Sequence, residues 1–353
     1  MVELNNIIFL LLLVFCGYFV SKYLIALLKK SKTNLLADNN LEKPQAFHEN
    51  STYRLGGLII FSLLILVFLY FFIFKNIFFS EYLSFCTLFF LLGFLDDLKI
   101  NIKPKFRLFL MIAFLIFLII FNELEIERVS VEYLGHLMTI DIFALFFVCL
   151  CILFIINGSN LIDGFNGLLG IHSFIIITIL FFINFNLENY NLAYFLFFTG
   201  ITILIFLTFN FPQAQIFLGD GGAYLIGSIV SISVITTNNL NPSISSFFFC
   251  ILLFYLFFEV FFSFFRKIFF VGQNPLLPDR SHLHMLFYKL LLKKDKNKLN
   301  SNYRVSIYIN LIYLLSIIPG FIFMTNGLFC RYYFFFLLIA YTLFYKTLYK
   351  KTG

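Results

Sequence analysis

Long apolar segments separated by short polar ones run along the whole chain. A helix needs about 20 apolar residues to cross a membrane, and about eleven segments satisfy this rule. They lie near 6–28, 57–74, 77–95, 106–122, 142–158, 168–184, 192–210, 220–237, 244–269, 305–325 and 327–348. The first is too long for a signal-peptide core and has no A-x-A-like cleavage site, so we expect it to stay in the protein. The pattern predicts an all-α, polytopic integral membrane protein with one transmembrane domain over residues 1–353.

Composition agrees with this class of fold. Hydrophobic residues make up 61% of the chain and charged residues only 12%, which is not the composition of a soluble domain. The 6 Cys lie in or near apolar segments and have neither metal-ligand spacing nor the spacing of a disulfide framework. We interpret them as small buried hydrophobic residues.

Basic residues predict the orientation in the membrane. Lys and Arg accumulate on the cytoplasmic side of bacterial membranes. If the N-terminus lies outside, all 25 basic residues fall on the cytoplasmic side except Lys75, Arg128 and Arg331. An odd number of spans then places the C-terminus in the cytoplasm. The net charge of +7 follows from this bias, so it indicates a lipid bilayer and not a nucleic acid as partner.

Three polar segments lie between the apolar ones. Residues 129–140 alternate and turn at Gly135, which is compatible with a small extracytoplasmic β-hairpin or with a plain loop. The longest polar segments, 29–54 and 267–304, are predicted to be cytoplasmic. We expect the chemistry on that side.

The run NGSNLIDGFNGL at residues 157–168 interrupts the apolar pattern with three amides, a carboxylate and three glycines. A carboxylate at membrane depth costs about 2.5 to 3.5 kcal/mol on insertion scales. The run therefore indicates a cavity, a bound cation or a ligand.

Four carboxylates lie at predicted cytoplasmic ends of spans: Asp96, Asp97, Asp163 and Asp220. Each alone could be a solvated helix cap, but four acids from three separate segments indicate helices bundled around one cleft. Glycines flank Asp220 and leave room for a metal-bound phosphate. Four basic residues follow the Asp96-Asp97 pair, and Lys105 is among them.

The segment PDRSHLH at residues 278–284 supplies donors for an anion. If it is extended, Arg280, His282 and His284 can face one ligand; a solvated basic loop is the alternative. A zinc site is disfavoured, because no Cys or third spaced ligand accompanies the histidines. Mg²⁺ prefers few protein oxygens together with substrate phosphates, so this residue set fits a magnesium diphosphate better than an ion channel or a proton relay.

Together these motifs resemble the polyprenyl-phosphate N-acetylhexosamine-1-phosphate transferases of glycosyltransferase family 4, most closely the N-acetylglucosamine-type members. The resemblance covers nearly the whole chain and includes RLGG at 54–57, the Asp96-Asp97 pair, the run 157–168, FLGD at 217–220 and the segment 278–284. It implies transfer of a sugar-1-phosphate from a UDP-N-acetylhexosamine to undecaprenyl phosphate with release of UMP. It further implies Mg²⁺, with Mn²⁺ as an alternative ion, and a site on the cytoplasmic face of the bacterial inner membrane. The product would initiate a cell-envelope glycan such as O-antigen, and a homodimer is compatible with this family.

The resemblance also implies roles for individual residues. The expected metal ligands are Asp220 and Asn160, and the expected catalytic residues are Asp96, Asp97, Lys105 and Asp163. The expected substrate-binding residues are Asn157, Gly164, Phe165, Asn166, Phe217, Arg280, His282 and His284. Within this set, residues 163–166 resemble a uridine pocket, Phe217 a ring that stacks on uracil, and residues 280–284 a diphosphate and sugar loop.

Three positions depart from the family pattern. Asn166 stands where many bacterial members have Asp, and the eukaryotic N-acetylglucosamine branch also has Asn there. Met285 stands where many relatives have a third His. Glu259 stands where Asp is usual, and we expect it to pair with Arg266.

Alternatives remain for both mechanism and function. A phosphate monoester has a second pKa near 6, so a lipid phosphate needs little deprotonation at neutral pH. Direct in-line attack, with Asp96 orienting the acceptor, is therefore favoured over a covalent aspartyl intermediate. Other readings are a phospho-N-acetylmuramoyl-pentapeptide transferase, an inactive family member altered at Asn166 and Met285, and a secondary transporter. The transporter interpretation is disfavoured because the two halves show no internal repeat.

Overall fold

Helices form nearly all of the regular structure. The computed structural model of the chain describes residues 2–31, 36–38, 52–100, 102–272, 274 and 279–352. In these residues the elements are α1 (Val2–Ser31), β1 (Ala37–Asp38), β2 (Thr52–Arg54), α2 (Gly56–Tyr70), η1 (Phe71–Lys75), α3 (Ser80–Asp97), α4 (Pro104–Phe121), α5 (Glu132–Met138), α6 (Asp141–Ile162), α7 (Leu168–Asn186), α8 (Tyr190–Asn210), β3 (Ile216–Phe217), α9 (Gly219–Leu240), α10 (Ser246–Leu252), α11 (Phe254–Phe265), η2 (Arg266–Val271), α12 (Leu283–Asp295), α13 (Lys298–Ile322) and α14 (Gly327–Thr352). The elements η1 and η2 are π-helical turns that continue α2 and α11.

The helices have the length and composition of membrane spans. Within the described ranges, nine are long and apolar enough to cross a membrane. The pair Ser246–Leu252 and Phe254–Phe269, bent by 72°, adds a tenth if it counts as one span. The remaining expected span is α3, which has 18 residues but carries Glu81, Asp96 and Asp97 and is therefore less apolar. The expectation of an all-α, polytopic membrane protein is thus confirmed in outline.

Residues 129–140, for which the sequence left a β-hairpin and a plain loop open, contain a helix. Residues Glu132–Met138 form the short helix α5, in which the Gly135 N–H donates to the Val131 carbonyl (2.9 Å). The apolar residues Leu134, Leu137 and Met138 have helical spacing, and Met138 packs against the core. Apolar and polar residues alternate over 129–133, as in a strand, and this alternation hid the helical spacing that follows it.

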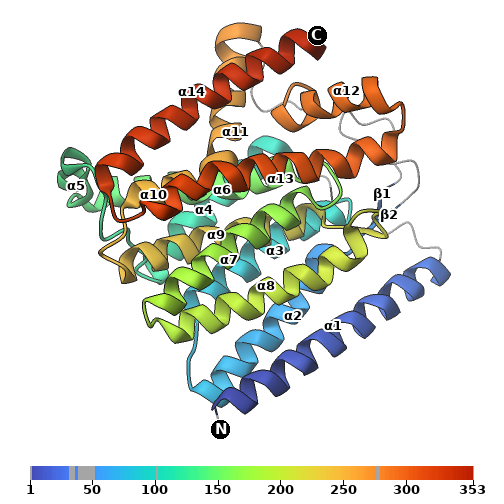
Figure 1. Cartoon of the computed structure of the whole chain (residues 1–353). Helices are drawn as coiled ribbons and strands as arrows, with labels where there is room; N and C mark the ends of the chain where they lie inside the picture. Colours follow the sequence, from blue (N-terminus) through green and yellow to red (C-terminus); the bar gives the residue numbers. More distant parts are fainter. Residues whose placement is uncertain are drawn as a thin grey trace.

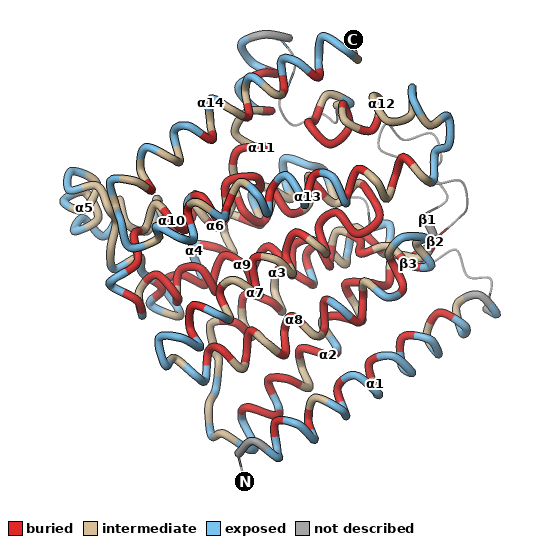
Figure 2. Tube along the Cα trace, in the orientation of Figure 1, coloured by how far each residue is buried: buried red, intermediate tan, exposed pale blue. Residues whose placement is uncertain are grey.

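Helix α9 is the centre of the bundle. In its most apolar window 83% of residues are buried, compared with 22% for α1 and 17% for α14. The buried positions accordingly lie on the central helices, whereas α1 and α14 expose much of their length (Figure 2). Large apolar side chains such as Phe15 and Leu343 are exposed on these outer helices, as expected for contact with lipid.

Small residues let α3 approach the start of α9. A Cβ on Gly93 of α3 would lie 2.5 Å from the backbone carbonyl of Asp220, so only glycine fits there. Gly219 opens α9 with φ +79°, and a Cβ there would lie 2.5 Å from an oxygen of Asp97. The close approach brings the C-terminal end of α3 onto the N-terminal end of α9.

A small sheet joins two predicted motifs at the same end of the bundle. Strand β2 pairs antiparallel with β1 and parallel with β3, with Arg54 in register with Phe217. The N–H of Gly57 donates to the carbonyl of Leu218 (2.8 Å), which continues this pairing. The strands and α12 lie at one end of the bundle, and α5 lies at the other (Figure 1).

Candidate active site

The carboxylate of Asp97 binds the first turn of α9. Its Oδ1 accepts the backbone N–H of Asp220 (3.0 Å), and its Oδ2 accepts that of Gly221 (2.9 Å). Arg54 reaches the same carboxylate (3.2 Å), whose side chain is only 2% exposed. The N-terminus of a helix has unpaired N–H groups and a positive dipole, so a buried carboxylate is stable there. Asp97 therefore fixes the position of Asp220.

Arg107 joins two further carboxylates. Its guanidinium donates to Asp96 and lies 3.4 Å from Oδ2 of Asp220. We did not predict Arg107 as a site residue. A signal was present, because a basic residue in the first turn of an apolar helix needs an acidic partner. Lys105, which was predicted, lies exposed two residues earlier in the same turn.

Asp163 and Asn160 complete this end of the bundle. Asp163 follows α6 directly, and burial, together with the charges of Asp220 and Asp97, raises its pKa to about 8 despite the opposing charge of Arg54. Asn160 lies near the hydroxyl of Tyr224, one turn after Asp220 on α9. We call Asp96, Asp97, Asp163 and Asp220 the acidic cluster. The predicted convergence of these four acids is present in the structure.

The acidic cluster has the donor chemistry of a magnesium site. Its four acidic side chains outnumber the guanidinium groups of Arg54 and Arg107, and the pKa of Asp163 is raised first by burial and then by the charges of Asp220 and Asp97. In the described part of the chain no group of three or more His, Cys, Asp or Glu side chains could hold a metal ion. Mg²⁺ is usually held by only one or two protein groups and substrate phosphates. The oxygens of Asp220 and Asn160 fit that requirement.

The expected uridine-pocket residues divide into two groups. Gly164 has open space where a Cβ would point, and Phe217 is partly exposed on β3. Phe165 is buried and its ring lies 5.8 Å from that of His284 and 5.2 Å from that of Tyr288. Gly164 and Phe217 are therefore the accessible members, and Phe165 belongs to the supporting layer.

Asn166 and Asn157 make internal hydrogen bonds. The Asn166 amide donates to the Pro212 carbonyl (3.0 Å), and its backbone N–H donates to Oδ1 of Asn302 (2.9 Å). An ionised Asp at position 166 has no hydrogen to donate to a carbonyl. The hydrogen bond to Pro212 therefore depends on the Asn that distinguishes this chain from many bacterial members. The Asn157 amide donates to the Leu153 carbonyl of its own helix (2.8 Å).

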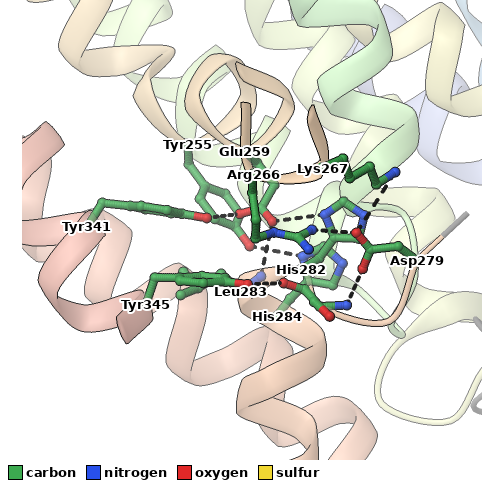
Figure 3. Close-up of polar contacts among 11 residues, drawn as sticks. Tyr255, Glu259, Arg266, Lys267, Asp279, His282, Leu283, His284, Tyr341 and Tyr345 are labelled. Atoms are coloured by element: carbon green, nitrogen blue, oxygen red, sulfur yellow. Dashed lines mark hydrogen bonds and ion pairs between the residues drawn. The ribbon is translucent and has the colours of Figure 1, made fainter. Parts of the chain in front are cut away.

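A second polar cluster surrounds Glu259 on α11. Its Oε1 accepts the Leu283 N–H (3.0 Å) and lies 3.1 Å from Nδ1 of His282, and its Oε2 accepts the hydroxyl of Tyr341 (Figure 3). Nδ1 of His284 lies 3.2 Å from the Tyr255 hydroxyl. We call Tyr255, Glu259, His282, His284 and Tyr341 the histidine cluster.

The segment around the two histidines is extended only in part. Helix α12 begins at Leu283, so His284 lies in the first helical turn, and both histidine side chains are buried. His282 is extended (φ −70°, ψ 151°), and the rings of His282 and His284 are parallel with centroids 5.6 Å apart. Burial lowers the pKa of His284 to about 3, so its imidazole is neutral. Arg280 is exposed beside them, and Pro278 lies outside the described residues.

The expected pair between Glu259 and Arg266 is wrong. Arg266 donates to Asp279, and Lys267 lies 3.9 Å from the same carboxylate (Figure 3). Regular α-helix separates Glu259 from Arg266, so the two residues lie about two helical turns apart, roughly 10 Å along the axis, and Arg266 meets Asp279 instead. Glu259 instead accepts from the segment that contains His282.

Known proteins resemble this chain. Residues 79–238, which include the whole acidic cluster, match the model of glycosyl transferase family 4. A phospho-N-acetylmuramoyl-pentapeptide-transferase of Dictyoglomus thermophilum is 33% identical over 199 residues, 54% of this chain and 61% of that protein. An undecaprenyl-phosphate alpha-N-acetylglucosaminyl 1-phosphate transferase of Thermotoga maritima is 29% identical over 204 residues, 58% and 60% of the two chains.

These matches confirm the family resemblance expected from the motifs and support the expected class of enzyme, a phosphoglycosyltransferase. The chain spans about three fifths of the length of the relatives it matches. A match to a transferase family also argues against the transporter interpretation. The two relatives are named for different sugars, so the matches do not choose between these substrates.

Proposed function

We propose that this protein transfers a sugar-1-phosphate from a UDP-sugar to undecaprenyl phosphate and releases UMP. The match of residues 79–238 to glycosyl transferase family 4 supports this activity. The observation that carries this proposal is the meeting of Asp97 with the backbone of Asp220 and Gly221. This contact joins α3 to α9 at one end of an apolar bundle, and Asp163, directly after α6, lies close enough for Asp220 and Asp97 to raise its pKa. A soluble nucleotide-sugar and a lipid phosphate can both reach such a place.

The acidic cluster would bind the metal and the reacting phosphates. Asp220 and Asn160 would hold Mg²⁺, with Mn²⁺ as an alternative, and Asp97 would keep Asp220 in place. When bound, the ion would neutralise charge on the diphosphate and the leaving UMP. Asp96, held by Arg107, would orient the lipid phosphate for direct attack, and Lys105 would contact a phosphate.

The remaining site residues would bind the UDP-sugar. Phe217 would stack on uracil above the open space at Gly164, while Asn166 and Asn157 hold the surrounding backbone. Arg280, His282 and His284 would contact the diphosphate and the sugar, because hydrogen-bond donors there complement a dianion. Asp163, with its raised pKa, would carry a proton that a nearby phosphate oxygen could accept as a hydrogen bond.

The membrane arrangement is part of the proposal. The N-terminus would lie outside and the C-terminus in the cytoplasm, with α3 and the bent pair α10–α11 counted among eleven spans of the bacterial inner membrane. The positive-inside rule supports this orientation, since only three basic residues, Lys75, Arg128 and Arg331, fall on the opposite side. The acidic cluster then faces the cytoplasm, where nucleotide-sugars are made.

The sugar is proposed to be N-acetylglucosamine or a related N-acetylhexosamine. The test is UMP release by the purified protein from a panel of UDP-sugars, including UDP-N-acetylglucosamine and UDP-N-acetylmuramoyl-pentapeptide, with undecaprenyl phosphate and Mg²⁺. We expect release only when donor, acceptor and metal are all present. UMP release from UDP-N-acetylmuramoyl-pentapeptide alone would show that the protein is a phospho-N-acetylmuramoyl-pentapeptide transferase. If no donor gave UMP, the proposal would be refuted.

A further inference from the structure

The C-terminal helix α14 touches the candidate site through tyrosines. The helix buries one stripe of side chains, formed by Cys330, Leu337, Tyr341, Tyr345 and Leu348. A chain with 56 Phe residues has no need of tyrosine for apolar contact alone. A buried hydroxyl in an apolar environment is costly unless it has a partner. The partners of the two tyrosines therefore indicate what they do.

Both hydroxyls hold the segment of residues 279–284, which we call the histidine segment. Tyr345 donates to the carbonyl of Ser281 (2.9 Å), the residue directly before His282. Tyr341 donates to Glu259, whose other oxygen lies 3.1 Å from Nδ1 of His282 and accepts the N–H of Leu283 (3.0 Å). The backbone on both sides of His282 and its ring are thus tied to α14, directly or through one carboxylate (Figure 3).

The same contacts decide which imidazole atoms face a ligand. Nδ1 of His282 is engaged by Glu259, and Nδ1 of His284 by Tyr255, so Nε2 is the nitrogen of each ring that points elsewhere. Nε2 of His284 is buried and has no hydrogen-bond partner within the described part of the chain. Buried polar atoms are nearly always paired, so a water or ligand oxygen is expected there.

We propose that Tyr341 and Tyr345 are positioning residues of the transferase site, which hold His282 and His284 at the angle needed to bind the diphosphate of the UDP-sugar. This inference rests on the proposed function. Neither tyrosine touches substrate; each acts through the histidine segment. Helix α14, which is otherwise mostly exposed, then has a task beyond anchoring the chain.

The test replaces single hydroxyls in the full-length protein. Tyr341→Phe and Tyr345→Phe each remove one hydrogen bond to the cluster. Tyr333→Phe is the matched control, because Tyr333 lies on the same helix and donates to the Ser316 carbonyl (2.8 Å), away from the histidine segment. We expect kcat/KM for the UDP-sugar to fall about tenfold in the first two variants and less than about twofold in the control. KM for undecaprenyl phosphate should stay unchanged in all three.

A purely structural role predicts another pattern. All three variants would then lose similar thermal stability, and their kcat/KM values for the donor would change equally, which would overturn the inference while leaving the proposed function intact.

Hydrogen–deuterium exchange of residues 279–284 supplies a readout that does not depend on activity. We expect faster exchange at Ser281 and Leu283 in Tyr341→Phe and Tyr345→Phe than in Tyr333→Phe, because both residues flank the tethered His282. Equal exchange in all three variants would overturn the inference. If the wild-type protein released no UMP from any UDP-sugar, the proposed function would be refuted. The exchange rates would still show whether α14 holds the histidine segment in place.

Discussion

The acidic cluster and the histidine cluster differ in how fully their carboxylates are paired with hydrogen-bond donors and positive charges. Glu259 is surrounded by donors from His282, Leu283 and Tyr341, so its carboxylate is satisfied by the protein. In the acidic cluster four carboxylates share two guanidinium groups, and the pKa of Asp163 is raised to about 8. A satisfied cluster is a rigid support, whereas one with excess negative charge is suited to bind a cation. We therefore assign metal binding to the acidic cluster and the fixed placement of His282 and His284 to the carboxylate of Glu259.

The largest expected effect is on activity, at Asp220. Asp220→Asn keeps the side-chain shape but removes a charged oxygen, so we expect kcat to fall about 100- to 1,000-fold. Thermal stability should stay the same or rise, because repulsion with Asp97 and Asp163 is relieved. Steady-state UMP release and a thermal melt measure the two quantities.

Asp295→Asn is the matched control for this variant. Asp295 pairs with Arg304 at the end of α12, outside both clusters, and its loss should leave kcat unchanged. Equal kcat values for the two variants would remove the distinction on which the comparison rests.

The next largest effect is on stability, at Glu259. Glu259→Gln turns an acceptor of three hydrogen bonds into a group with its own buried donors, so we expect the free energy of unfolding to fall by about 3 kcal/mol. Chemical denaturation in detergent measures this change. Glu132→Gln on the exposed surface of α5 should change it by less than about 0.5 kcal/mol. A Glu259→Gln protein as stable as the Glu132 variant would contradict the supporting role of the histidine cluster.

A smaller effect is expected where α3 meets α9. Gly93→Ala places a Cβ 2.5 Å from the backbone of Asp220, and the helices must separate to admit it. We expect a loss of about 1 to 3 kcal/mol in unfolding free energy, together with reduced kcat as Asp220 moves. In Gly135→Ala the nearest atom lies 3.8 Å from the new Cβ, so that variant should be neutral or slightly stabilised. Equal behaviour of both variants would show that the close approach is unimportant.

The last predicted effect is a dependence of stability on pH. Because the folded-state pKa of Asp163 is raised to about 8, the metal-free folded protein keeps a proton that the unfolded chain releases near pH 4. Its contribution to stability is therefore present below pH 4 and is lost as pH rises towards 8, by less than about 1.4 kcal/mol per pH unit.

Asp163→Asn should make this dependence shallower, because one acid of the cluster no longer titrates, and Asp141→Asn at the exposed opposite end of α6 should leave it unchanged. The measurement is chemical denaturation of all three proteins in chelator at several pH values. A wild-type profile that overlays the Asp163→Asn profile would contradict the raised pKa of Asp163 and the burial that causes it.

The apolar pattern predicted most of the fold, because burial in lipid requires nearly continuous apolar helices. It could not predict α5, because this short segment combines the two-residue alternation of a strand with the three- and four-residue spacing of a helix. The acids of the candidate site were predictable, since burying a carboxylate at the end of an apolar span is energetically unfavourable unless it has a partner or a ligand. Their individual partners were not predictable from sequence alone.

Partners depend on tertiary contacts between distant segments. Asp97 and Gly221 are 124 residues apart, and Tyr341 and Glu259 are 82 residues apart. The expected pairing of Arg266 with Glu259 failed because the two residues lie about two helical turns apart, and each finds its partner in the segment of residues 279–283. Arg107 carries the same sequence signal as Lys105, since both are basic residues in the first turn of the apolar helix α4.

The most direct test of the account is the binding of Mn²⁺ as a substitute for Mg²⁺, followed by electron paramagnetic resonance in the presence of UMP. We predict saturable binding to the wild-type protein and to Asp295→Asn, and loss of that binding in Asp220→Asn. If Asp220→Asn bound Mn²⁺ as tightly as the wild type, or if the wild type bound none, the acidic cluster would not be the metal site and the central claim would be wrong.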